Sequence, residues 1–266
     1  MTDRQKAILD LLERQGAAGY ADLAARFQVS TMTIRRDVEE LANQRAVVKT
    51  IGGAQKADAP AYLYETALHA RLGVHASEKR TIAETALQAI GSRRTIFLDG
   101  STTCLELGRL LAKRPDGLTI LTNSSLLCNE VGRNREHTVI CLGGEYDADS
   151  LSFVGPSAED AARKYFVDLL VVSTKGFIPN EGTFESAVAN FRIKQIIARQ
   201  AKEVMLLVDH SKFGERALSK VLDISQIHIV VTDRQTPRSA LTALRRRGVK
   251  VMVAEAIRKE PATHAA

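Results

Sequence analysis

Seven short apolar runs with helical patterns between them constrain the fold of this chain more than any other feature. The runs lie at 95–98, 118–121, 138–142, 169–172, 204–208, 227–231 and 249–253. Residues 77–90 and 102–111, on either side of the first run, have the apolar spacing of helices. Parallel strands need long, usually helical connections, and helices then cover both faces of the sheet. The pattern predicts a doubly wound, mainly parallel α/β sheet over residues 75–255.

The first 56 residues have a different pattern, which predicts three helices followed by a β-hairpin. Residues 3–15 and 20–27 have helical apolar spacing, and only Gln28, Val29 and Ser30 separate the second helix from a third. Ser30 is a favoured N-cap, so we expect the third helix to begin at Thr31. A β-branched run at 47–51 precedes Gly52 and Gly53, which is typical of a small β-wing. This arrangement predicts a winged helix-turn-helix domain.

The third helix of this domain is the expected DNA-recognition helix. Its apolar residues Ile34, Val38 and Leu41 form one stripe, so the opposite face points outward. Two arginines on a helix are most often only solvated, but the preceding helix and the turn favour contact with a double-stranded DNA operator. Residues 1–58 contain nine Lys and Arg against eight Asp and Glu, so placement matters more than bulk charge. The expected DNA-contacting residues are Thr31, Met32, Thr33, Arg35, Arg36 and Lys49.

Composition limits the remaining classes of protein. The chain has 266 residues, 45% of them hydrophobic, and a net charge of +6. No apolar stretch is long enough to span a membrane, so we expect a cytoplasmic protein without membrane partners. Cys104, Cys128 and Cys141 are widely spaced in apolar surroundings, which favours reduced core thiols over a disulfide or a metal site. We expect no metal and no cofactor.

Polar or glycine-containing turns follow three successive strands of the predicted sheet. Their candidate ligand-binding residues are Asp99, Gly100, Ser101, Thr102, Thr103, Thr122, Asn123 and Gly143. Ligands of such sheets bind at the carboxyl ends of the strands, and backbone N–H groups at a helix start attract anions. A single Ser-Thr-Thr helix start is more often only a cap. Three polar or glycine-containing turns at successive strand ends are harder to explain by capping alone, and together they favour an anion site.

The chain resembles the DeoR family of bacterial transcriptional regulators along nearly its whole length. In the first domain the resemblance rests on Arg4, Ile8, Leu11, Val29-Ser30, Thr33-Ile34-Arg35-Arg36-Asp37 and Gly52-Gly53-Ala54. In the second it rests on the strand-end turns and on Asp209-His210-Ser211-Lys212-Phe213. The resemblance implies a sensor domain similar to ribose-5-phosphate isomerase, with a phosphorylated sugar or a related metabolite as effector. The chain departs from the family pattern at Arg45, Ile51, Ser101 and Asn190.

Lysines near the strand ends are the candidate cations for such an effector. Lys175 and Lys212 follow predicted strands, whereas Lys194 is either a ligand-binding or a structural residue. Asp209 completes the expected effector site. His210 has no serine or cysteine nucleophile arranged with it in the sequence, so we expect no catalytic role and no enzyme activity.

These observations together predict a metabolite-responsive regulator, expected to repress a carbohydrate-utilisation operon. The alternatives are a sugar-phosphate isomerase-like enzyme with an attached DNA-binding domain and a DNA-binding scaffold whose second domain is inert. We expect a DNA-binding domain at 1–56, a linker at 57–74, an effector-sensing domain at 75–255 and a flexible tail at 256–266. Because specific regulators bind paired half-sites, a homodimer or homotetramer is expected.

Overall fold

The computed structural model divides the chain into two compact units, Met1–Val74 and His75–Ala266. It describes residues 1–15, 17–44, 46–49, 53–56, 68–92, 94–115, 117–186 and 188–255. For residues 13–15, 17, 48, 49, 55, 56, 69, 70 and 188–190 it describes the backbone alone. The predicted linker is described only from Leu68, and the predicted tail at 256–266 lies outside the described residues.

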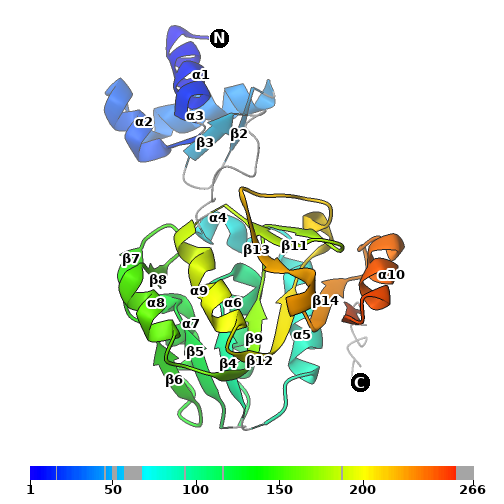
Figure 1. Cartoon of the computed structure of the whole chain (residues 1–266). Coiled ribbons are helices and arrows are strands. Elements are labelled where there is room, and N and C mark those ends of the chain that lie inside the picture. Colours follow the sequence, from blue (N-terminus) through cyan, green and yellow to red (C-terminus); the bar gives the residue numbers. More distant parts are fainter. Residues whose placement is uncertain are drawn as a thin grey trace, which may run out of the picture. The chain divides into compact units, whose positions relative to one another are not determined.

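The first unit contains the predicted three helices and the wing (Figure 1). Its elements are α1 (Asp3–Gln15), β1 (Ala17–Gly19), α2 (Tyr20–Phe27), α3 (Thr31–Asn43), β2 (Val47–Lys49), β3 (Gly53–Lys56) and α4 (Leu68–Leu72). The core joins Ile8 of α1 and Leu23 of α2 to the predicted stripe of α3, and these side chains have no exposed surface. The three predicted helices and the β2–β3 hairpin are confirmed.

Strand β1, between the first two helices, was not predicted from the sequence. It pairs antiparallel with β3, which gives a three-stranded sheet of order β1-β3-β2. Gly53 faces Gly19 in this pairing, and a Cβ atom at Gly53 would lie 2.0 Å from the carbonyl oxygen of Ala18. Glycine is therefore required here for the close approach of two strands.

The second unit is built on a seven-stranded parallel sheet of order β15-β14-β12-β9-β4-β5-β6 within the described residues. Its strands are β4 (Thr95–Leu98), β5 (Thr119–Thr122), β6 (Thr138–Cys141), β9 (Val167–Val172), β12 (Ala201–Leu207), β14 (Ile229–Asp233) and β15 (Lys250–Ala254). Each strand overlaps one of the seven predicted apolar runs. The prediction of a parallel α/β sheet is confirmed.

Helices cover both faces of this sheet (Figure 1). They are α5 (Ala76–Gln88), α6 (Thr102–Leu111), α7 (Ser125–Val131), α8 (Pro156–Ala162), α9 (Val188–Ala198) and α10 (Arg238–Arg246). Helix α6 packs against α5 and α7, whereas α8 packs against α9 in front of the sheet in Figure 1. No helix in the described ranges is long and apolar enough to cross a membrane.

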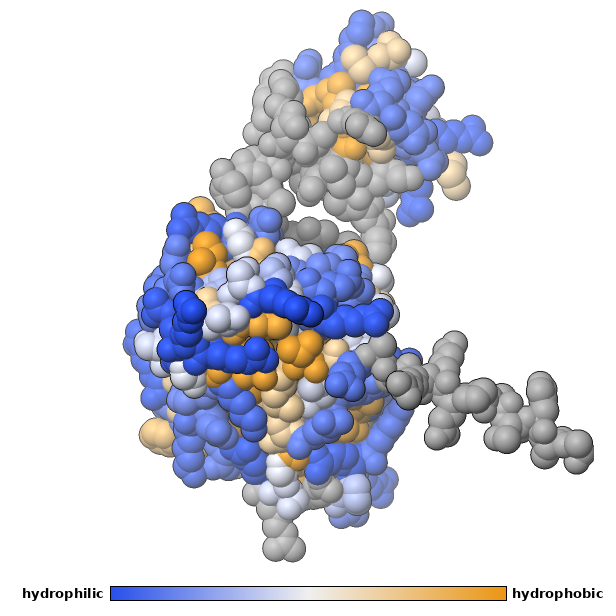
Figure 2. All heavy atoms as spheres, turned by 90° about the vertical axis from the view of Figure 1, so that its right-hand side faces the viewer, coloured by the Kyte–Doolittle hydropathy of each residue, from blue (hydrophilic) through white to orange (hydrophobic). Residues whose placement is uncertain are grey.

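The apolar runs predict seven buried strands, but the edge strands β15 and β6 are only partly buried. An edge strand is covered less completely than a central one. Figure 2 looks onto the side of the second unit that carries β15, where hydrophobic residues gather among hydrophilic ones. On the other edge, β6 leaves Cys141 exposed, although all three cysteines were predicted to be core thiols. That prediction holds for Cys104, which is buried, and is wrong for Cys141. All three cysteines are free.

Two small antiparallel sheets also escaped prediction. Strands β7 (Glu145–Asp147) and β8 (Ser152–Val154) form a hairpin, and β10 (Gly176–Ile178), β11 (Gly182–Glu185) and β13 (Ser219–Asp223) form a second sheet. Two short 3-10 helices, His210–Lys212 and Ile224–Gln226, complete the unit. The hairpin follows β6 in the chain and β10 follows β9, so both small sheets extend from the carboxyl edge of the parallel sheet.

Candidate functional sites

The first candidate site is the outward face of α3. Ser30 caps this helix as predicted, because its Oγ accepts a hydrogen bond of 3.1 Å from the backbone N–H of Thr33. The opposite, apolar face of the helix is fully buried. The side chains of Thr31, Met32, Arg35 and Arg36 are exposed. The first two turns of α3 therefore present hydroxyl, thioether and guanidinium groups to solvent.

Contacts with neighbouring helices hold α3 in place. The Nε atom of Arg4 on α1 lies 2.5 Å from Oδ2 of Asp37, which is almost completely buried. Gln5, also on α1, donates a hydrogen bond of 2.6 Å to Glu40. The guanidinium group of Arg35 lies over the ring of Tyr20 on α2, 5.1 Å from its centre, as in a cation–π contact. The acidic groups Asp37 and Glu40 are thus bound by α1.

Five of the six predicted DNA-contacting residues lie on this helix. Thr33 is half-buried and its hydroxyl lies 2.9 Å from that of Ser30, so both hydroxyls belong to the cap. The backbone of Lys49 belongs to the wing strand β2, and its side chain lies outside the described residues. Arg45 and Ile51, which depart from the family pattern, also lie outside them.

The second candidate site lies where the strand order of the parallel sheet reverses. From β4 the chain proceeds to β5 and β6 on one side, whereas β9, β12, β14 and β15 lie on the other. The helices after β4 and after β9 therefore lie on opposite faces, and in open α/β sheets ligands bind at such a switch point, outside the carboxyl ends of the strands. Asp99 follows β4 and Ser173 follows β9, and the backbone N–H of Ser173 donates to Asp99 Oδ2 over 3.1 Å.

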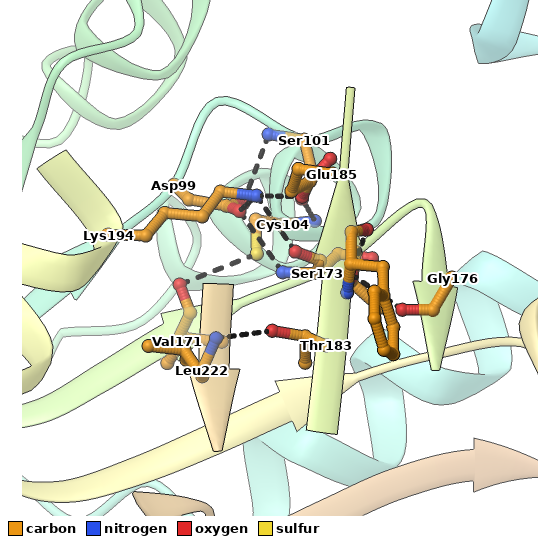
Figure 3. A network of polar contacts seen from close by, with 12 residues as sticks. Asp99, Ser101, Cys104, Val171, Ser173, Gly176, Thr183, Glu185, Lys194 and Leu222 are labelled. Atoms are coloured by element: carbon orange, nitrogen blue, oxygen red, sulfur yellow. Dashed lines mark hydrogen bonds and ion pairs between the residues drawn. The ribbon is translucent and has the colours of Figure 1, made fainter. Parts of the chain in front are cut away.

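Asp99, Glu185 and Lys194 form a buried ion network at this point (Figure 3). The ammonium group of Lys194 lies 2.8 Å from Asp99 Oδ2 and 2.5 Å from Glu185 Oε1. It also donates a hydrogen bond of 2.9 Å to the carbonyl oxygen of Ser173. The other oxygen of Asp99 accepts the N–H of Ser101 at 3.0 Å. The network ties together the ends of β4, β9 and β11 and helix α9.

The electrostatics of this network favour the charged forms of Asp99 and Lys194. Burial alone would raise the pKa of Asp99, but the Lys194 ammonium and several hydrogen bonds lower it below its ordinary value. Burial alone would lower the pKa of Lys194, and the carboxylates of Asp99 and Glu185 raise it instead. Burial and the Asp99 charge raise the pKa of the nearby Cys104 thiol well above normal, so that thiol is neutral.

The start of α6 lies beside this network and has unused hydrogen-bonding groups. Ser101 caps α6, since its Oγ accepts the N–H of Cys104 at 3.2 Å. Thr102 and Thr103 are 6% and 3% exposed, yet within the described residues neither hydroxyl has a protein partner. Their hydroxyl oxygens are nevertheless open to solvent, because neither is among the fully buried polar atoms that lack a partner. The first turn of α6 therefore offers two free hydroxyls next to its N–H groups.

Other predicted effector residues are already engaged within the protein. Thr122 Oγ1 accepts the N–H of Ser124 at 3.0 Å, and the Asn123 amide donates to the carbonyl oxygen of Phe153 at 3.0 Å. Gly143 is exposed beyond the end of β6. A Cβ atom at Gly100 would lie 2.4 Å from the Ser152 hydroxyl, so the β7–β8 hairpin closely approaches the end of β4.

The remaining predicted residues lie on two neighbouring segments. Phe177 and Phe213 form a parallel bridge, so the segments that carry Lys175 and Lys212 run side by side. The Lys175 ammonium donates to the Ser186 hydroxyl over 3.0 Å, whereas Lys212 has no ion pair with a described residue. Asp209 is buried and accepts the N–H of Ser211 at 3.0 Å.

Comparison with protein families identifies both units. Residues 74–234 match the model of the DeoR C terminal sensor domain, and residues 4–59 match that of the DeoR-like helix-turn-helix domain. The chain belongs to the DeoR family. As a DeoR-family protein with both domains, it is a DNA-binding transcriptional regulator, and the resemblance seen in its sequence is confirmed.

Curated relatives of this DeoR-family protein span nearly its whole length. The glycerol-3-phosphate regulon repressor of Escherichia coli (strain K12) is 30% identical over 91% of this chain and 95% of its own. The L-fucose operon activator of the same strain is 31% identical over 90% and 98%. Among solved structures, ribose 5 phosphate isomerase A from Neisseria gonorrhoeae is 15% identical, with a TM-score of 0.39, over 52% of this chain and 53% of that chain.

Sequence reasoning missed two groups of the second candidate site. Glu185 was not considered, although it supplies the second carboxylate of Lys194, because it lies on a short strand outside the parallel sheet. Ser173 contributes only backbone atoms, which carry no residue-type signal. Asn190 departs from the family pattern because glutamate is often found at the aligned position, where it would supply a carboxylate. Glu185 provides a carboxylate in this neighbourhood, and the side chain of Asn190 lies outside the described residues.

Proposed function

We propose that this DeoR-family protein is a cytoplasmic repressor of a carbohydrate-utilisation operon, released when a phosphorylated sugar or a related metabolite binds its sensor domain. The names of its relatives support this class, since they are regulators of glycerol-3-phosphate and sugar operons. Two of these relatives are named as repressors and one as an activator. The proposed role of the second unit is binding without turnover.

The observation that carries the effector proposal is the start of α6. Two buried threonines there have free hydroxyls, and they lie at the topological switch point of the sheet. Backbone N–H groups of a helix start, together with hydroxyls, suit the oxygens of a phosphate or a sugar. We assign Thr102 and Thr103 to direct contact with the effector.

The ion network has a positioning role in this proposal. Asp99 is 1% exposed, and both of its oxygens are bonded within the protein. Lys194 is neutralised by two carboxylates, so it contributes little net positive charge to an anion. We therefore assign Asp99 and Lys194 to holding the strand ends together. The cations that attract the effector are then Lys175 and Lys212, which lie on paired segments.

The DNA-binding part of the proposal concerns how α3 is used. We propose that α3 enters the major groove with its exposed side chains towards base edges, and that Lys49 of the wing contacts phosphate. One such domain makes few phosphate contacts, so we propose that the protein binds paired half-sites as a homodimer or homotetramer. The ion pairs of Asp37 and the hydrogen bond of Glu40 keep acidic charge on α3 bound to α1.

The test is an operator-binding titration with a panel of candidate effectors. A duplex selected from a random library by the protein serves as operator, and fluorescence anisotropy gives its Kd with each sugar phosphate and with each free sugar. The proposal predicts that one phosphorylated compound weakens binding by about 5- to 150-fold, as is typical of allosteric coupling, while its free sugar does not. A panel in which no compound changes the Kd would contradict the effector proposal.

The same samples separate the regulator from an enzyme. After incubation with the full-length protein, each compound is recovered and analysed for conversion to an isomer. The proposal predicts recovery of the unchanged compound that shifts operator binding. Conversion at a rate that depends on protein concentration would favour the isomerase-like alternative.

A further inference from the structure

Met32 is the feature of α3 that its DNA-binding role leaves unexplained. Its side chain is 61% exposed, although it is large and apolar. It is the second residue of the helix, in the turn where helix-turn-helix proteins contact base edges. Its outward neighbours Thr31, Arg35 and Arg36 are polar or charged. An apolar group at this position needs a partner in the groove if it is to contribute to binding.

The chemistry of the thioether restricts what that partner is. Methionine has no hydrogen-bond donor, and its sulfur is only a weak acceptor. In the major groove, the C5-methyl group of thymine is the apolar group that the base pairs display. We propose that Met32 packs on the C5-methyl group of a thymine in each operator half-site and thereby determines specificity at that position. This inference rests on the DNA-binding role of α3.

The surroundings of Met32 support this assignment. The hydroxyls of Ser30 and Thr33 lie 2.9 Å apart and serve the cap, so they are occupied at the start of the helix. Met32 and Arg36 are four residues apart and share one face of α3. Arg36 has no ion pair among the described residues, so its guanidinium group is available for a base or a phosphate beside the Met32 contact.

The alternative is that Met32 is an ordinary exposed apolar residue, since isolated ones are common on protein surfaces. Removal of the side chain alone does not distinguish a thymine contact from an ordinary exposed residue, because Met32→Ala also changes the helix surface. Removal of the methyl group from the DNA does separate them. Deoxyuridine pairs like thymidine and lacks only the C5-methyl group.

The experiment replaces each thymidine of the selected operator, one symmetric pair at a time, with deoxyuridine. The Kd is measured by fluorescence anisotropy for wild type, Met32→Ala, Met32→Leu and the control Leu218→Ala, which removes an exposed apolar side chain from the other unit. At one position, wild type and Leu218→Ala should lose about fourfold in affinity per half-site, the effect of burying one methyl-sized group. Met32→Leu should retain part of that sensitivity.

The decisive comparison is with Met32→Ala, whose affinity should not change on deoxyuridine substitution at that position. Either of two results would overturn the Met32 contact: no substitution weakens wild type, or the sensitive position is equally sensitive in Met32→Ala. Both leave the regulator role intact, because wild type still binds its operator. Failure of wild type to select any DNA sequence would instead overturn the DNA-binding role, and with it this inference.

Discussion

Helices α3 and α6 begin in the same way and are covered differently. Each has a serine N-cap whose Oγ accepts a backbone N–H, at 3.1 Å for Ser30 and 3.2 Å for Ser101, and each continues with threonine. Thr31 is nevertheless exposed at the start of α3, whereas Thr102 is buried at the start of α6. Local sequence sets the helix start, and the packing around it decides which anion can reach it.

The difference arises from how much of each helix is covered. Four residues of α3 are buried, and they lie on one side. Seven residues of the shorter α6 are buried, including Gly108, where a Cβ atom would lie 2.3 Å from a methyl carbon of Leu127 on α7. An exposed helix can lie in the groove of a long polyanion such as DNA. A helix start buried at the end of a sheet suits only a small anion.

The largest expected effect concerns the buried network of Asp99, Glu185 and Lys194. Lys194→Met leaves two buried carboxylates without their cation, so the second unit should lose about 3–5 kcal/mol of stability. Urea unfolding of the full chain measures this loss, and amide hydrogen exchange in β4 and β9 locates it in the second unit. Lys202→Met is the matched control, because it breaks the exposed Lys202–Asp168 pair and should change stability little. Equal effects of both variants would refute the role of the network.

The second prediction separates the two helix starts by function. Thr103→Val removes one hydroxyl at nearly constant volume, and should weaken effector binding by about 1.5–3 kcal/mol, the value of a hydrogen bond to a charged ligand. Operator binding without effector should stay at the wild-type level. Isothermal titration calorimetry and operator anisotropy measure the two affinities, with Thr242→Val on α10 as control. A wild-type effector response in Thr103→Val would place the effector site elsewhere.

The third prediction concerns operator binding by α3. Arg36→Ala should weaken operator binding by about 1–3 kcal/mol in a sequence-selective manner if Arg36 contacts a base. If it contacts phosphate, the loss should be uniform across sequences and should reduce the salt slope by about 1. Arg246→Ala on α10 of the sensor unit removes the same charge as control. Unchanged operator affinity in a folded Arg36→Ala protein would contradict the assignment of α3.

The smallest expected effect concerns the serine N-cap of α3, a type of cap that α6 also has. Ser30→Ala leaves the N–H of Thr33 without its acceptor and should destabilise α3 by about 1 kcal/mol. Amide hydrogen exchange in α3 should accordingly be about fivefold faster, with no change in the second unit. Ser239→Ala on α10, where no described cap bond is lost, serves as control. Wild-type exchange in α3 would show that the cap is dispensable.

The sequence alone was sufficient for the elements with strong local signals. The apolar stripe of α3 and the start of α6 at Thr102 were predicted from periodicity and capping residues and are confirmed. The seven parallel strands were predicted because buried β-branched and leucine-rich runs differ clearly from their helical connections. Boundaries shifted by one or a few residues, since hydrogen bonding rather than hydropathy ends a strand.

What the sequence left open depends on contacts between distant residues. Glu185 and Asp99 are far apart in the chain, and only the folded sheet brings both to Lys194. Strands β1 and β10 are three residues long, too short for a period-2 pattern to identify them. The choice between a ligand-binding and a structural Lys194 likewise needed the positions of its partners.

The central claim is that the sensor site and the operator surface are coupled, and effector affinity measured with and without operator tests it most directly. Linkage requires the two ligands to change each other's affinity by the same factor. If a sugar phosphate weakens operator binding by a given factor, saturating operator should weaken its binding to the full-length protein by that same factor in isothermal titration calorimetry. An effector affinity that is identical in the presence and absence of operator would contradict the account.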